Sequence, residues 1–280
     1  MNPQGIHHRR AQEPDPIEHI PSQFCKDLQI LFTDIDDTLT TNGLLPPSSY
    51  TALWRAVEAG IRVVPVTGRP AGWCDHIARM WPVAAVIGEN GAFYFTYDRQ
   101  ERRMRREYFD SKEKRKEAEA GLDRIRLEVL RNVPGAAVAA DQPFRMADLA
   151  IDFREDVPPL DEASIDEICR IARRHGAVCK VSSIHVNIWY GSYDKVSCIR
   201  AYLERELGTT FEAVSDKILF IGDSPNDEPS FEHFPVSVGV ANIRSLLHRL
   251  RHPPRYITSR EGAEGFAETV DRILEKRAKT

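Results

Sequence analysis

The sequence predicts an α/β protein: a Rossmann-like core built on a parallel sheet, into which a smaller α+β cap is inserted. Three observations lead to this expectation. Short apolar runs alternate with amphipathic helical patterns up to about residue 95, the pattern changes over 96–190, and the first pattern then resumes to the end of the chain. Alternating strands and helices are typical of a parallel sheet with right-handed crossovers. We therefore expect a core from 27–95 and 191–280, and a cap from 96–190.

The first part of the core is expected to contain three strands separated by two helices. The strands are the apolar runs at 28–33, 61–66 and 84–87. The first helix begins near Pro47 and ends before Gly60, a residue that readily adopts the left-handed conformation after a helix. Apolar residues recur at helical spacing in both helices. The expected apolar faces consist of Tyr50, Leu53, Trp54 and Val57 in the first helix, and Trp73, Ile77 and Met80 in the second.

The inserted segment reads as two successive strand–helix units followed by a pair of strands. The first unit has a charged strand near 102–109 and a helix from Ser111 to about Arg131. The remaining elements are a strand at 149–153, a helix at 161–175, and strands at 177–182 and 185–190. This order predicts a small α+β domain that covers part of the core.

The last part of the chain returns to the parallel pattern. A helix is expected over 194–207, because apolar residues share one face and Gly208 follows. The further elements are strands at 217–221 and 236–240, and helices near 243–251 and 262–277. The chain thus completes its first domain after the insert.

Composition and charge restrict the class of protein. The chain has 280 residues, of which 42% are hydrophobic, and its 38 Lys and Arg against 42 Asp and Glu give a net charge of -4. This balance lacks the basic excess of a typical nucleic-acid-binding protein, so we expect a small-molecule partner. No apolar stretch approaches the roughly 18 to 20 residues of a membrane helix.

The N-terminal residues and the cysteines indicate a cytoplasmic protein. Residues 1–26 are polar and lack the apolar region of a signal peptide, so we expect a flexible leader, a soluble cytoplasmic protein and no membrane partner. The five cysteines form no C-x-x-C pair and are expected to be reduced thiols that pack as small apolar residues.

Polar residues follow several of the predicted parallel strands at their carboxyl ends. Asp34 and Asp36 follow the first strand, Thr67 the second and Asn90 the third. A later strand is followed by Asp223 and Asp227. Ligands bind beyond the carboxyl ends of strands in open α/β sheets, so these side chains predict one site. Acidic oxygen donors without histidine favour a hard cation, and Mg²⁺ fits this set best.

The two aspartates after the first strand suggest phosphoryl transfer. A metal beside Asp34 neutralises the repulsion between its carboxylate and an approaching phosphoryl group. Asp34 could then attack phosphorus and form an aspartyl phosphate. Asp36 could protonate the leaving oxygen and later deprotonate water.

Four ordered motifs resemble those of the haloacid dehalogenase superfamily. They are DIDDT at 34–38, VTGR at 66–69, Lys195, and GDSPND at 222–227. The long insert and GENGA at 88–92 are similar to Cof-like sugar-phosphate phosphatases, a class with an α/β cap that also includes sucrose-phosphate phosphatase. Glycine often follows the motif lysine in this family, whereas here Val196 follows Lys195.

The resemblance implies a role for each matching residue. Asp34 would be the nucleophile and Asp36 the acid/base, with Mg²⁺ held by Asp34, the backbone carbonyl of Asp36, and Asp223. Thr67 and Lys195 would bind the phosphoryl oxygens. The remaining residues of the expected pocket are Gly68, Asn90 and Asn226, with Asp227 supporting the metal site or Lys195.

The cap offers two candidate substrate contacts and one basic segment. His185 and Asn187 lie at alternate positions of a strand and therefore on one face, from which they could bind a sugar, whereas Ile184 and Val186 would face the interior of the cap. Five arginines between 99 and 106 are most simply an exposed, charged face.

The sequence favours a Mg²⁺-dependent phosphatase that hydrolyses a small phosphorylated metabolite, with a sugar phosphate as the expected substrate. A phosphomutase of the same superfamily and a non-catalytic protein that binds phosphorylated metabolites remain as alternatives. A nucleic-acid role through the arginines is a third.

Overall fold

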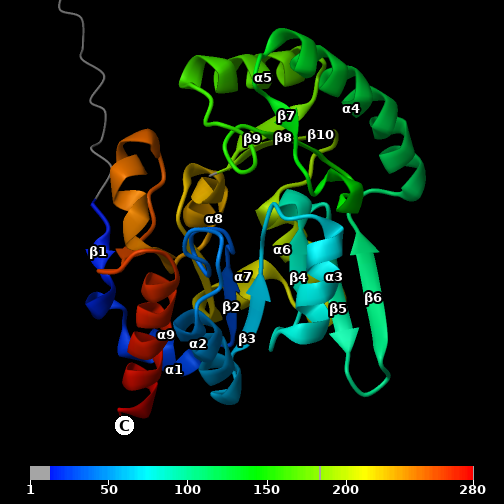
Figure 1. Ribbon diagram of the computed structural model, residues 1–280. Coiled ribbons are helices and arrows are strands. Elements are labelled where there is room, and N and C mark those ends of the chain that lie inside the picture. Colours follow the sequence, from blue (N-terminus) through cyan, green and yellow to red (C-terminus); the bar gives the residue numbers. More distant parts are fainter. Residues whose placement is uncertain (1–12, 183, 280) are drawn as a thin grey trace, which may run out of the picture.

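A six-stranded sheet forms the centre of the computed structural model, which describes residues 13–182 and 184–279. All five pairs of neighbouring strands are parallel, in the order β1-β13-β12-β11-β2-β3. The strands are β1 (Asp15–Pro16), β13 (Tyr256–Ile257), β12 (Ser237–Gly239), β11 (Ile218–Gly222), β2 (Ile30–Thr33) and β3 (Arg62–Pro65). The predicted parallel core is therefore confirmed (Figure 1).

Side chains alternate between the two faces of this sheet, and helices cover both faces. Leu31 and Val63 belong to one apolar cluster, whereas Phe32 and Val64 belong to the other. Successive side chains of a strand point to opposite faces of the sheet. Because helices cover both faces, the side chains on each face of a strand must be apolar. The first cluster contains residues of α1 (Ser22–Asp27), α2 (Pro47–Glu58), α3 (Ala71–Met80) and α9 (Gly262–Ala278). The second contains residues of α6 (Lys195–Leu207), α7 (Phe211–Val214) and α8 (Glu228–His233).

A three-stranded antiparallel sheet adjoins the core beside β3. It consists of β4 (Val86–Gly88), β5 (Phe93–Asp98) and β6 (Arg103–Tyr108). We expected residues from 96 onward to open the cap, but the β5–β6 hairpin pairs with β4 instead. Phe93 and Phe95 explain the difference, because they are buried in the first core cluster and anchor the hairpin there. The chain leaves the core near Asp110.

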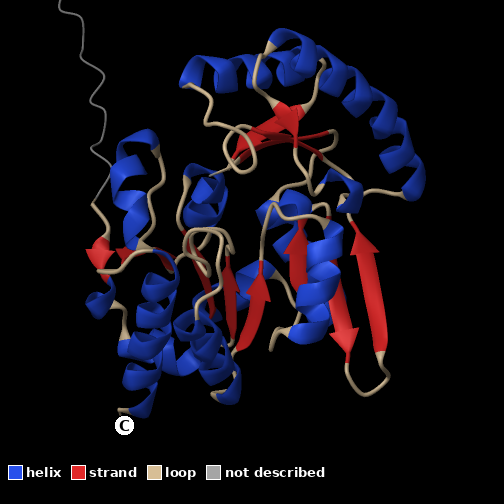
Figure 2. Cartoon of the chain, viewed as in Figure 1, coloured by secondary structure: helices blue, strands red, loops and turns tan. Residues whose placement is uncertain are grey.

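The cap is a four-stranded antiparallel sheet with two helices (Figures 1 and 2). Its strands run in the order β7-β8-β10-β9. Its elements are β7 (Ala137–Val138), β8 (Leu149–Asp152), β9 (Val178–Val181), β10 (His185–Trp189), α4 (Lys112–Asn132) and α5 (Glu162–Arg174). A separate apolar cluster joins the sheet to α4 and α5, so the cap has its own core.

The two points where the chain crosses between core and cap lie against each other. Gly191 adopts a φ of +117°, and a Cβ atom at this position would lie 2.7 Å from Oδ2 of Asp110. A side chain therefore cannot be accommodated here without displacement. The exit and the return of the chain form one narrow connection.

The N-terminal segment is more ordered than we expected. Residues 1–12 of the predicted leader lie outside the described residues, but 13–26 pack onto the core. Ile17 and Ile20 are fully buried in the first cluster, and Nζ of Lys276 donates to the backbone carbonyl of Ile20 at 2.6 Å. The prediction of a flexible leader is wrong for this part, because its few apolar residues all point inward.

Three aromatic or long apolar side chains differ from their predicted burial. Trp54 is 46% exposed, Trp73 43% and Met80 63%. Helix α2 buries the smaller residues Ala52 and Ala56 instead. Helix α3 likewise buries Cys74 and Ala78, which leaves the ring of Trp73 at the surface.

Short 3₁₀ helices complete the chain: η1 (Ile17–His19), η2 (Glu89–Gly91), η3 (Gln142–Phe144), η4 (Ser215–Lys217), η5 (Pro225–Asp227) and η6 (Ala241–Arg249). All five cysteines are buried and unpaired, as expected. Among the described residues, no helix is both long enough and apolar enough to cross a membrane.

Candidate active site

Three neighbouring parallel strands deliver acidic or hydroxyl side chains to one end of the sheet. Asp34 follows β2, Thr67 follows β3 and Asp223 follows β11, and these strands are adjacent in the order β11-β2-β3. Backbone hydrogen bonds hold the strand ends in register, including one from the Asp34 N–H to the Ile221 carbonyl at 2.9 Å. The predicted convergence of these residues is thus present in the structure.

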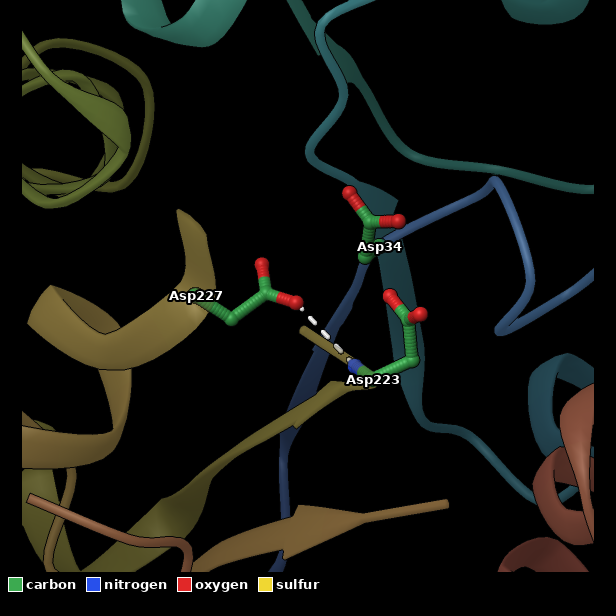
Figure 3. A group of neighbouring side chains, drawn as sticks. All are labelled: Asp34, Asp223 and Asp227. Atoms are coloured by element: carbon green, nitrogen blue, oxygen red, sulfur yellow. Dashed lines mark hydrogen bonds between the residues drawn. The ribbon is translucent and has the colours of Figure 1, made fainter. Parts of the chain in front are cut away.

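Asp34, Asp223 and Asp227 form a buried acidic cluster (Figure 3). One carboxylate oxygen from each lies within 4.8 Å of the others. Asp227 comes from η5, and its Oδ2 accepts a hydrogen bond from the Asp223 backbone N–H at 3.1 Å, drawn in Figure 3. This bond fixes Asp227 and orients the turn after β11.

Lys195 connects the nucleophile candidate with Asp227. Its Nζ donates to Oδ1 of Asp34 and to Oδ1 of Asp227, each at 2.7 Å. Lys195 is the first residue of α6, whose N-cap Asp194 accepts a hydrogen bond from the Ser197 backbone N–H. The capped helix therefore begins at the lysine and points its side chain into the cluster.

One lysine among three buried carboxylates leaves the cluster with excess negative charge. Burial and the carboxylates of Asp227 and Asp36 raise the pKa of Asp34 to about 8, although Lys195 acts in the opposite direction. Burial and the neighbouring Asp34 raise the pKa of Asp223 well above its usual range. Burial opposes protonation of Lys195, but the two aspartates nevertheless raise its pKa.

This charge imbalance fits a divalent cation. Both oxygens of Asp227 already accept hydrogen bonds, whereas Oδ2 of Asp34 receives none that the structure records among the described residues. Asp223 accepts from the Thr38 hydroxyl at 3.5 Å and from the Asn242 amide at 3.2 Å. Mg²⁺ is usually held by one or two carboxylates. Asp34 and Asp223 are thus suited to ligate it, and Asp227 to support Lys195.

Asp36 is turned toward the neighbouring strand and held by Arg69. The guanidinium of Arg69 donates three hydrogen bonds to the Asp36 carboxylate, between 2.8 and 3.1 Å. Arg69 is 5% exposed and also contacts Oε1 of Glu155 in the cap at 3.0 Å. A forked pair of this kind fixes both distance and orientation. Arg69 therefore links the acid/base candidate to the cap.

The turn after β3 packs against the turn after β4. The Arg69 backbone N–H donates to Oγ1 of Thr67 at 3.0 Å, and the Asn90 N–H donates to the Thr67 carbonyl at 3.0 Å. A Cβ atom on Gly68 would lie 3.2 Å from Nδ2 of Asn90, so only glycine leaves this contact unstrained. Thr67, Gly68 and Asn90 are thus neighbours, as predicted.

A pocket lies between this end of the core and the cap. Its walls include Asp34, Asp36, Gly68, Asp223 and Asn226 from the core, and Ser182, Ile184, His185 and Asn187 from the cap. His185 and Asn187 are both buried on β10 and face the pocket. Val186 packs inside the cap, as expected. Ile184 does not, because it belongs to the turn before β10 and lines the pocket.

The cap residues that line the pocket are fixed by further charged groups. Nε2 of His185 lies 2.9 Å from Oε2 of Glu155. The contact with His185 and the guanidinium of Arg69 lower the pKa of Glu155 to about 2, against the opposing effect of burial. Nδ2 of Asn187 donates to Asp148 at 3.2 Å, and Arg145 binds both Asp148 and the Gly68 carbonyl.

Glu89 holds the cap to the core. Its carboxylate accepts hydrogen bonds from the backbone N–H of Ala71 in the core at 3.0 Å and of Met146, Ala147 and Asp148 in the cap. Glu89 and Asn90 both have positive φ angles, 44° and 57°. Non-glycine residues rarely adopt this conformation, so it marks a constrained turn.

Sequence reasoning missed Arg69, Glu89, Arg145 and Glu155. Arg69 and Glu89 stand within the VTGR and GENGA motifs, so the sequence does mark their positions. Arg145 and Glu155 lie in cap loops of mixed composition, where neither periodicity nor spacing distinguishes them from surface charges.

A family model of haloacid dehalogenase-like hydrolases matches residues 31–123. The matched segment contains Asp34, Asp36, Thr67 and Asn90, which the structure places at one end of the sheet.

Solved structures share the fold at low sequence identity. A HAD/COF-like hydrolase from Plasmodium vivax has a TM-score of 0.65 and 17% identity, with 91% of this chain and 99% of that chain covered. The C-terminal domain of trehalose-6-phosphate phosphatase from C. albicans has a TM-score of 0.68 and 12% identity, with coverages of 95% and 99%.

A third solved structure of this fold is the sucrose-phosphatase from Synechocystis sp. PCC6803 in complex with sucrose and phosphate. Its TM-score is 0.60 and its identity 16%, with 89% of this chain and 98% of that chain covered. These likenesses confirm the core and cap architecture. Over residues 31–123, this chain is similar to haloacid dehalogenase-like hydrolases.

Proposed function

We propose that this protein is a Mg²⁺-dependent phosphatase that removes phosphate from a small phosphorylated metabolite, a sugar phosphate, through an aspartyl phosphate on Asp34. The observation that carries the proposal is the contact of Lys195 with both Asp34 and Asp227 at 2.7 Å, beside Asp223. An ammonium group and a cation beside one carboxylate offset the charge of a phosphoryl group that approaches it.

Asp34, Asp223 and the backbone carbonyl of Asp36 are the groups that would hold Mg²⁺. The bound ion would supply charge neutralisation and orient the phosphoryl group. Lys195 would bind a phosphoryl oxygen, and the Thr67 hydroxyl and the Asn226 amide would provide further donors around it. Each of these donors is set at a strand end or a helix N-terminus, so little reorganisation is required.

Asp34 would attack phosphorus as the bond between phosphorus and the leaving oxygen breaks. Asp36 would give its proton to that oxygen, which leaves as an alcohol. In the second step Asp36 would take a proton from water as the water attacks the aspartyl phosphate, which releases inorganic phosphate and regenerates Asp34. Arg69 would hold the Asp36 carboxylate in place between these two steps.

The sugar assignment rests on the cap side of the pocket. His185, Asn187 and Ser182 present hydrogen-bonding groups opposite the acidic cluster, within reach of hydroxyl groups on a bound substrate. Proteins of the same fold act on sucrose phosphate and trehalose 6-phosphate, as their names state. A polyhydroxylated alcohol would offer further hydrogen-bonding partners to these polar side chains.

The direct test is a screen of the purified protein with Mg²⁺ against a panel of phosphorylated metabolites, with released phosphate as the readout. We expect release from sugar phosphates by the wild-type protein and none by Asp34→Asn. No release from any member of the panel would reject the proposal. Isomerised product in the presence of a bisphosphate activator would identify a phosphomutase instead.

A further inference from the structure

A second, larger cavity of about 550 Å³ lies beside the pocket of the candidate active site. The turn after β2 forms one wall with Ile35, Thr40 and Leu45, and α3 forms another with Trp73, His76 and Ile77. Trp81 and Phe144 complete the lining. Phe144 belongs to η3 of the cap, so the core and the cap each contribute an aromatic wall. We refer to this cavity as the aromatic groove.

The aromatic groove adjoins the pocket of the candidate active site, because Asp36 lines both cavities. Arg69, the partner of Asp36, lies over the ring of Trp73, with 4.4 Å between the guanidinium carbon and the ring centroid. Asp36, Arg69 and the indole ring of Trp73 therefore form a chain of contacts from the candidate active site to the wall of the groove.

The aromatic groove has a mostly apolar lining, although it lies beside a candidate active site rich in charged groups. Asp36 and the imidazole of His76 are the ionisable side chains among the described lining residues. Trp73 is 43% exposed and Phe144 58%, although large aromatic rings are normally buried. Contiguous exposed apolar surface of this kind marks binding sites.

The position of Phe144 over the groove depends on Gly72 in the core. A Cβ atom on Gly72 would lie 2.9 Å from Cβ of Phe144, which is closer than such atoms normally approach. Gly72 therefore allows η3 to pack against α3 and bring Phe144 over the groove. Both walls are in place only when the cap lies against the core.

Resting on the proposed function, we propose that the aromatic groove binds the alcohol portion of the substrate, and that this portion carries an apolar ring face beyond the phosphorylated group. Under the proposed function Asp36 would protonate the leaving oxygen, so the leaving alcohol would lie on the side of Asp36, a residue that also lines the groove. Flat aromatic walls bind ring faces, whereas they offer no hydrogen-bonding partner to a hydroxylated or anionic chain. The volume falls within the range of about 300 to 1,000 Å³ typical of ligand pockets.

The substrate class that follows is a phosphate monoester with two parts. Its phosphorylated, hydroxylated part lies between the acidic cluster and His185 and Asn187, and a second ring extends between Trp73 and Phe144. A phosphorylated sugar without a second ring would leave the groove unfilled.

The test compares phenyl phosphate with 2-naphthyl phosphate, which differ by one fused ring. One additional methylene in an apolar pocket changes kcat/KM by roughly 10 to 200-fold, so we expect wild-type protein with Mg²⁺ to prefer the naphthyl ester by at least about tenfold. Trp73→Ala and Phe144→Ala should each bring this ratio close to one, and Trp73→Phe should retain part of it. The ratio corrects for general loss of activity, because both esters require the same chemistry.

Trp54→Ala is the matched control. Trp54 is 46% exposed, as Trp73 is 43% exposed, but it lies on α2 outside the groove lining. The control should keep the wild-type preference. Equal kcat/KM for the two esters in wild-type protein, or a preference that survives in both Trp73→Ala and Phe144→Ala, would overturn the proposal.

A binding measurement separates this proposal from the proposed function. Calorimetric titration of Asp34→Asn protein with each ester measures the groove without turnover, and we expect tighter binding of the naphthyl ester. Equal affinities would reject the groove as a ring site. Selective binding together with no hydrolysis of either ester by wild-type protein would reject phosphatase activity and leave the groove assignment standing.

Discussion

Replacing Lys195 by methionine tests whether the acidic cluster depends on this single ammonium group. Methionine has a similar length and no charge, so the substitution leaves Asp34 and Asp227 buried without their common partner. Breaking a buried ion pair by removing one partner costs about 3–5 kcal/mol. At about 2–4 °C for each kcal/mol in a chain of this size, Tm should fall by about 6–20 °C in the absence of metal.

Differential scanning calorimetry with and without Mg²⁺ measures this loss, and phosphate release measures activity. Mg²⁺ should recover part of the lost Tm, because a divalent ion replaces the missing positive charge, whereas turnover should remain low because a phosphoryl-binding group is absent. The exposed Lys26→Met provides a control that should change neither quantity. If Lys195→Met unfolds at the wild-type temperature in metal-free buffer, the cluster does not need its ammonium group and the electrostatic reasoning is wrong.

Four further outcomes are expected. Chelation should abolish phosphate release, and Mg²⁺ should restore it while Ca²⁺, which prefers a looser and higher coordination, does so poorly; full activity in excess chelator would exclude the metal. With an activated aryl phosphate, Asp36→Ala should slow hydrolysis of the phosphoenzyme more than its formation, so acid quench should trap phosphate on Asp34, and finding none would count against the double role. His185→Ala and Asn187→Ala should each lower kcat/KM for the natural substrate by roughly tenfold to a few hundredfold and leave p-nitrophenyl phosphate little changed; equal losses on both would assign them to folding or chemistry. Ile17→Ala should destabilise the protein by about 2–5 kcal/mol in a denaturant titration, and an unchanged midpoint would show that the N-terminal segment is not part of the core.

The core strands β2, β3, β11 and β12 and the residues that follow them could be predicted from the sequence, because each depends on a local pattern. A buried parallel strand must be apolar on both faces, so β2 and β11 are visible as short apolar runs, and Asp34 and Asp223 are visible where the runs stop. The parallel arrangement then brings these ends together without further information.

The contacts across the interface of core and cap could not be predicted in the same way. Arg69 meets Asp36 and Glu155, which are 33 and 86 residues away in the chain. Nothing in the local composition around Glu155 distinguishes it from an exposed glutamate. The order of the N-terminal segment could not be predicted for a related reason. Ile17 and Ile20 are isolated apolar residues among polar ones, and their burial depends on packing against α9.

The close contact between Asp110 and Gly191 has a consequence for how such an enzyme can change over evolutionary time. A domain whose two ends meet at one point can be lengthened, shortened or exchanged without separating the strand ends that carry Asp34 and Asp223, because the host needs only the two adjacent attachment points. If the proposed function holds, selectivity for new alcohols can then be acquired by altering the insertion, while the strand ends proposed to transfer the phosphoryl group are inherited unchanged. The proposed chemistry and the choice of substrate could therefore evolve as separate characters within a single chain.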